Sequence, residues 1–138
     1  MSLNQEIIRS RCQEIEDSLK RLEQIKGKSK EEFLKDSDMQ DIACYRLLIA
    51  IEASLNLCYH VAAKKLKKVP GEYAECFTFL VDAKIIDPEL GARLQRMARF
   101  RNLLVHMYWK VNFDTLYEII QNHLDDLRHF SQKIVSLL

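Results

Sequence analysis

An apolar stripe along residues 38–67 limits the possible folds of this chain more strongly than any other feature. The side chains of this stripe recur at offsets of three and four, the spacing of one face of an α-helix: Tyr45, Leu48, Glu52, Leu55, Tyr59, Ala63 and Leu66. The whole chain contains only 3 glycines and 2 prolines, whereas residues that favour helices are plentiful. The sequence therefore predicts an all-α fold built around a long helix over 38–67.

Similar patterns predict the other helices. They cover residues 3–25, a short piece over 29–34, residues 72–83, a segment that starts at Pro88 and continues to about residue 108, and residues 115–137. Ser29 and Glu32 have the spacing of a capping box, and Asn112 or Asp114 is expected to cap the last helix. No linker in the 138 residues is long enough to divide domains. We expect one domain, 1–138, with about five main helices.

Charge and cysteine usage exclude several classes of protein. The formal net charge is +1, so any RNA must meet a local cluster of charge. The four cysteines form no Cys-x-x-Cys pair and no cluster with zinc spacing, which favours apolar packing of reduced thiols and predicts neither a metal nor a cofactor: Cys12, Cys44, Cys58 and Cys76. We find no signal peptide and no apolar run of transmembrane length, and expect a cytoplasmic protein without membrane contact.

Two charged side chains interrupt apolar helical stripes. Arg101 continues the stripe of Leu90, Leu94 and Met97, where a hydrophobic residue is expected. Glu52 interrupts the stripe of the long helix in the same way. A charge near a core costs several kcal/mol, roughly, unless it is paired. The two residues are therefore expected to form a buried ion pair or to line a shared polar cleft.

Arg101 lies in a short segment rich in polar and aromatic side chains. On an ideal helix Asn102 and His106 share one face, and Arg101 and Tyr108 share the adjacent face. Arg101 and His106 are about 140° apart by the same arithmetic. Either the helix bends, or the two side chains cooperate across a two-fold dimer, which presents the same surface twice.

The segment resembles the R-x4-H-x-Y motif of the HEPN superfamily, specifically its HepT-like toxin branch. Residues 46–53, 70–86 and 100–106 also resemble segments of that family, so the similarity covers essentially the whole chain. The resemblance implies an all-α HEPN helical bundle of up-and-down helices that forms a homodimer. It also implies a metal-independent endoribonuclease, the toxin of a HEPN/MNT toxin–antitoxin pair.

The resemblance also suggests roles for individual residues. Arg101 and His106 would be catalytic, because histidine titrates near neutral pH and arginine offers a charged fork for phosphate. From the chemistry of the residues themselves, Asn102 would hold or orient the phosphate or the histidine, and Glu52 would help line the substrate cleft around Arg101. Tyr108 would accept AMP from an MNT-type nucleotidyltransferase antitoxin, and the added nucleotide would repel RNA.

Other interpretations remain open from the residues alone. One arginine and one histidine five residues apart are also typical of a salt-bridged arginine and a core histidine. Tyr108 at this spacing is also typical of an aromatic packing residue beside the motif. The alternative function is a non-catalytic HEPN module that docks a nucleotidyltransferase or a nucleotide.

Overall fold

The computed structural model describes residues 2–138, and this part of the chain contains helices but no strand. Seven α-helices and one short 3-10 helix follow in order: α1 (Gln5–Lys26), α2 (Lys30–Lys35), α3 (Ser37–Lys64), α4 (Tyr73–Asp82), α5 (Pro88–His106), η1 (Tyr108–Lys110), α6 (Phe113–Asn122) and α7 (Leu124–Val135). The all-α prediction is confirmed, but the expected number of about five helices is too low.

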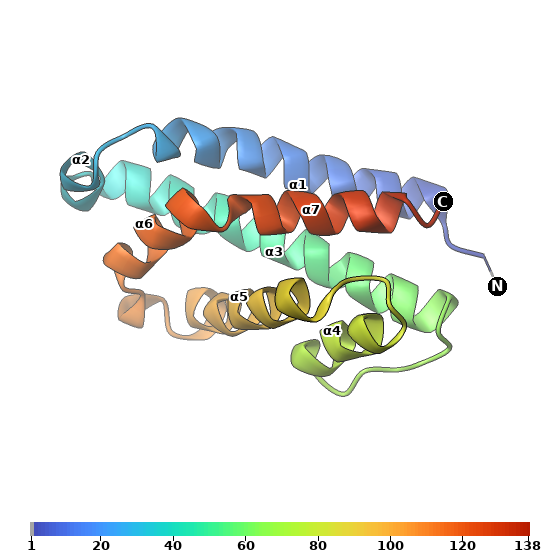
Figure 1. Cartoon of the computed structure of the whole chain (residues 1–138). Coiled ribbons are helices and arrows are strands. Elements are labelled where there is room, and N and C mark those ends of the chain that lie inside the picture. Colours follow the sequence, from blue (N-terminus) through green and yellow to red (C-terminus); the bar gives the residue numbers. More distant parts are fainter. Residues whose placement is uncertain (1) are drawn as a thin grey trace.

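The long helices α1, α3, α5 and α7 run alternately up and down, and α3 lies at the centre of the bundle (Figure 1). Helices α1 and α7 pack along one side of α3, and α4 and α5 pack along the other. The two ends of the described chain lie together, since Leu3 and Leu137 line one shallow hollow. This arrangement places the segment that follows α5 beside the first turns of α3.

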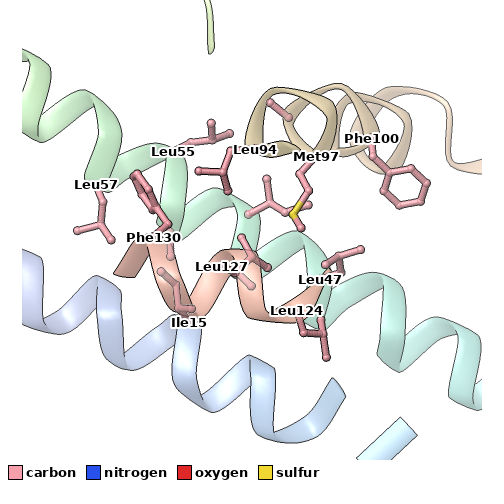
Figure 2. Packing of buried hydrophobic residues seen from close by; sticks show 14 of the residues in the cluster. Ile15, Leu47, Leu55, Leu57, Leu94, Met97, Phe100, Leu124, Leu127 and Phe130 are labelled. Carbon is pink, nitrogen blue, oxygen red and sulfur yellow. The ribbon is translucent and has the colours of Figure 1, made fainter. Parts of the chain in front are cut away.

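The core is built from leucine, isoleucine and phenylalanine side chains of all four long helices (Figure 2). Ile15 of α1, Leu47 of α3, Met97 of α5 and Phe130 of α7 are all buried there. Burial of such side chains stabilises the fold by roughly 1.5–3 kcal/mol each relative to leaving them exposed.

The buried surface of α3 differs from the predicted stripe. Buried residues surround most of the helix because other helices cover it on several sides. Along the predicted stripe, Tyr45 is exposed and Leu48 is half-buried. By length and composition alone α3 is apolar enough to cross a membrane, but 56% of its most apolar window is buried inside the bundle. The first part of the stripe therefore lies on the open side of α3, whereas Leu55, further along it, is buried. Apolar residues also cover the buried sides of the helix.

Most predicted helix ends are confirmed by hydrogen bonds. Both halves of the capping box are present, with the Glu32 amide donating to Ser29 Oγ and the Ser29 amide donating to Glu32 Oε1. Asn112, rather than Asp114, caps α6. Helix α3 ends at Lys64, three residues before its predicted end, and Lys67 then adopts a left-handed φ of 57° that turns the chain.

The predicted single helix over 115–137 is wrong, because the structure has two helices in this region. The chain bends at His123, whose ψ of 5° is not helical, and α6 and α7 lie on either side of the bend. Asp126, in the first turn of α7, accepts a hydrogen bond from Arg93 of α5 and contacts His123. This junction anchors the start of α7 to α5, and it adds one helix to the expected number.

Candidate functional site

The site begins with an ion pair between α5 and α3. Arg101 Nε donates to Glu52 Oε1, and Arg101 Nη1 donates to Asn102 Oδ1 at 3.1 Å. The guanidinium also lies over the ring of Tyr73 on α4, 5.1 Å from the ring centroid. Contacts from three helices therefore fix the orientation of Arg101, whose side chain is 14% exposed against 36% for Glu52.

Two shallow hollows border this ion pair. One is lined by Glu52, Leu55, Asn56, Tyr59 and Tyr73, and the other contains Asn102, Arg99 and Tyr73 in its lining. Tyr73 forms a wall of both. The two alternatives predicted from the sequence, an ion pair and a polar cleft, are thus both present, because the ion pair lies next to the two hollows.

His106 is the last residue of α5 and is exposed. Within residues 2–138 its ring has no hydrogen-bond or ion-pair partner. Both ring nitrogens are therefore available for hydrogen bonds to a ligand. Its position at the helix end leaves it open to a ligand or to a second copy of the chain.

Tyr108 does not share a helical face with Arg101. Helix α5 ends at His106, Met107 leaves the helical conformation with φ −141° and ψ 48°, and Tyr108 begins η1. The geometry predicted for a straight helix through Tyr108 is therefore wrong. The backbone turn carries the tyrosine toward α3 instead of along α5.

The Tyr108 hydroxyl contacts a carboxylate of α3. It donates a hydrogen bond to Asp41 Oδ1 at 2.9 Å, and the ring lines a hollow shared with Cys44, Leu48 and Leu104. The hydrogen bond to Asp41, followed by partial burial, raises the pKa of Tyr108 well above its ordinary value. The Tyr108 phenol is thus neutral at physiological pH, and its hydroxyl is hydrogen-bonded to the Asp41 carboxylate.

Comparison with known proteins identifies the family. The profile described as HepT-like, ribonuclease HepT-like, matches residues 15–134. The chain belongs to this family of HepT-like ribonucleases. The mRNA nuclease HepT of Shewanella oneidensis is 28% identical over 125 residues, which cover 91% of this chain and 93% of the relative.

Solved structures of toxin–antitoxin complexes contain the same HepT-like fold. The tri-AMPylated HEPN toxin of Shewanella oneidensis, in complex with its MNT antitoxin, matches with a TM-score of 0.88 and 28% identity, covering 97% of this chain and 99% of that one. A toxin–antitoxin crystal structure with AMP-PNP matches with a TM-score of 0.86 and 27% identity, covering 96% of this chain and 99% of that one. The helical bundle described above is thus the HEPN fold.

Two residues of this HepT-like site did not emerge from the sequence. The contact of Tyr73 with Arg101 depends on how α4 packs against α5. Asp41 lies four residues before Tyr45, so extending the α3 stripe backwards by one turn would have placed it on the open side. Neither residue has a local signal that reveals its partner.

The cysteines and the acidic residues of the HepT-like chain show no metal site. Within residues 2–138, no group of three or more His, Cys, Asp or Glu side chains is arranged to hold a metal ion. Burial raises the pKa of the Cys44 and Cys58 thiols, so both stay protonated. All four cysteines are free, and three of them are buried.

Proposed function

We propose that this chain is a metal-independent endoribonuclease toxin in which Arg101 and His106 act on RNA. One observation carries the proposal. Helix α5 holds both Arg101, whose orientation is fixed by Glu52, and, at its end, the exposed His106, whose ring has no partner within residues 2–138. The chain also belongs to the HepT-like ribonuclease family. One group supplies fixed positive charge, and the other exchanges protons.

The geometry supports an attack of the RNA 2′-oxygen on the adjacent phosphorus. A base takes the 2′-hydroxyl proton, the bond from phosphorus to the 5′-oxygen breaks, and an acid returns a proton to that oxygen. His106 can supply such proton transfer, which is worth typically about 10²–10⁴-fold in rate. Arg101 binds Glu52 and Asn102 through Nε and Nη1, which leaves Nη2 to stabilise charge on the phosphorane. Glu52 and Asn102 thereby orient the arginine.

A homodimer would complete this site. Exposed apolar side chains surround the motif, among them Tyr45, Val105, Tyr108 and Trp109, with Trp109 77% exposed. Of these four, Tyr45 and Tyr108 line the same hollow. Exposed apolar surface marks interaction sites, and a two-fold interface places such a surface against its own copy. Arg101 of one copy would then lie opposite His106 of the other, so the dimer would contain two equivalent sites.

Control of the nuclease is proposed to act at Tyr108. An MNT-type nucleotidyltransferase, the kind of partner present in the matched Shewanella complex, would transfer AMP to the phenolic oxygen. The adduct adds bulk and negative charge next to a surface that must receive RNA phosphates. This scheme places the toxin and its antitoxin in the cytoplasm, where ATP and RNA are both available.

Expression in bacteria tests the nuclease directly. The wild type should stop growth and fragment cellular RNA, whereas His106→Ala should do neither, and the purified wild type should cleave RNA in EDTA. The control is His129→Ala, which removes another exposed histidine, far along the chain on α7. Full activity of His106→Ala, or loss of activity in EDTA, would contradict the mechanism. A folded wild type that cleaves no RNA would favour the alternative, a non-catalytic module that docks a nucleotidyltransferase.

A further inference from the structure

The chain contains five tyrosines, and their hydroxyl groups have different neighbours. Tyr117 donates to the backbone carbonyl of Lys28 at 2.7 Å, and Tyr108 donates to the carboxylate of Asp41 at 2.9 Å. Within residues 2–138 the other three tyrosine hydroxyls make no hydrogen bond. A backbone carbonyl is too weakly basic to take a proton from a phenol, whereas a carboxylate is a common general base. Tyr108 is therefore the tyrosine of the described chain with a proton acceptor already in contact.

Asp41 has no competing partner in this hollow. The other titratable groups that line it are Cys44, Tyr45 and Tyr108 itself. Burial keeps the Cys44 thiol protonated by raising its pKa. No lysine or arginine lines the hollow, and Asp41 forms no ion pair within residues 2–138. The carboxylate is thus free to take a proton from the phenol.

We propose that Asp41 positions the Tyr108 hydroxyl and accepts its proton when AMP is transferred, an inference that rests on the proposed AMP regulation. In this step the phenolic oxygen attacks the α-phosphorus of ATP, and a new oxygen–phosphorus bond forms. The bond between the α-phosphorus and its bridging oxygen breaks, so pyrophosphate leaves. The phenolic proton moves to the Asp41 carboxylate.

This arrangement explains how one tyrosine can be both stable and reactive. The hydrogen bond from the hydroxyl to Asp41 favours the neutral phenol, so free phenolate does not form at neutral pH. Proton transfer then occurs only as the bond to phosphorus develops, with the acceptor already 2.9 Å away. Tyr45 borders the same hollow but lacks this contact, which accounts for selection of Tyr108 over its neighbour.

The test measures the rate of AMP transfer to the full-length chain by its nucleotidyltransferase partner, using radiolabelled ATP between about pH 6.5 and 9. Asp41→Asn keeps the size of the side chain and an oxygen that can accept the hydrogen bond, but it removes the base. The matched control is Asp38→Asn, which changes another exposed aspartate of the first turns of α3 that makes no tyrosine contact. Circular dichroism confirms that each variant is folded.

We expect kcat for AMP transfer to fall on the order of 100-fold in Asp41→Asn, with little change in KM for the chain. The rate of the variant should rise about tenfold per pH unit, because hydroxide or water must now remove the proton of a phenol with an ordinary pKa of about 10. The wild type and Asp38→Asn should show a nearly flat profile. Asp41→Glu should recover part of the loss, since it restores a carboxylate at a displaced position.

Three results would overturn the inference. An Asp41→Asn rate and pH profile equal to those of the wild type would remove the proton transfer to Asp41. A loss confined to KM would make Asp41 a docking contact for the partner. If the wild type itself takes no AMP on Tyr108, the proposed regulation fails and this inference fails with it, whereas the first two results leave that regulation intact.

Discussion

Arg101 of α5 and Glu52 of α3 are 49 residues apart in the sequence and form an ion pair at the edge of an open surface. Each interrupts an otherwise apolar stripe of its own helix. The pair is partly buried, which fixes the orientation of both side chains, and Glu52 also lines one of the two neighbouring hollows.

Removal of Arg101 should affect both stability and activity. Arg101→Ala leaves the Glu52 carboxylate without its partner, and we expect a loss of about 1–3 kcal/mol in the free energy of unfolding, less than for a fully buried pair because Glu52 is partly exposed. Glu52→Gln keeps an oxygen that accepts from Arg101 Nε, and should cost less than about 1 kcal/mol. Urea unfolding gives both values, and RNA cleavage should be lost in Arg101→Ala. Cleavage at the wild-type rate would remove Arg101 from the mechanism.

A shared site makes a specific prediction for mixed dimers. Neither Arg101→Ala nor His106→Ala should cleave RNA alone, but an equal mixture that has exchanged subunits should recover about a quarter of wild-type activity. Half of the dimers are then mixed. If each site combines Arg101 of one chain with His106 of the other, a mixed dimer has one intact site out of two. Light scattering should give twice the mass of the chain. A monomer that cleaves RNA, or a mixture without recovery, would contradict the composite site.

Tyr108→Phe should separate regulation from cleavage. The substitution removes only the hydroxyl, so the ring still packs in its hollow, and most of the nuclease activity should remain. The variant should take no AMP from the nucleotidyltransferase and should stay toxic when both proteins are expressed together. Mass spectrometry after incubation with the partner and ATP reports the modified residue. AMP on Tyr45 or Tyr117 would assign the acceptor role elsewhere.

Stability at high pH should depend on the same tyrosine. Hydrogen bonding to Asp41 raises the pKa of Tyr108 in the folded state above the value of about 10 in an unfolded chain. The stabilisation is therefore complete below pH 10 and is lost as pH rises from there through the folded-state pKa. Urea unfolding between about pH 9 and 11.5 should show a steeper loss for the wild type than for Tyr108→Phe. Parallel curves would show that the hydrogen bond does not persist in solution.

The packing of α4 against α5 can be tested at a glycine. A Cβ at Gly91 would lie 2.5 Å from Val81 Cγ2, so in Gly91→Ala either the Val81 side chain must rotate or α4 must move, and we expect a cost of about 1–3 kcal/mol. Gly27→Ala is the control, because the residue has ordinary helical backbone angles and a nearest neighbour at 3.6 Å. That variant should be neutral or slightly more stable. Thermal unfolding of the two variants checks both expectations.

Local patterns in the sequence were sufficient to predict the all-α class, most helix ends and the position of the central motif. Hydrogen bonds between near neighbours decide these features, as in the Ser29–Glu32 capping box and the Asn112 cap. The pairing of Glu52 with Arg101 was also predictable, because a charge in an apolar stripe requires a partner and the chain offers one of each sign.

Only the tertiary structure decided the remaining features. At the bend, Asp126 contacts both His123 and Arg93, and Arg93 lies 33 residues earlier in the chain. The open side of α3 and the contact between Tyr108 and Asp41 depend on which helices cover α3 and on a backbone turn at Met107. Periodicity reports that a helix has an apolar face, but it does not report which neighbour covers that face, because coverage is set by packing between segments far apart in the sequence.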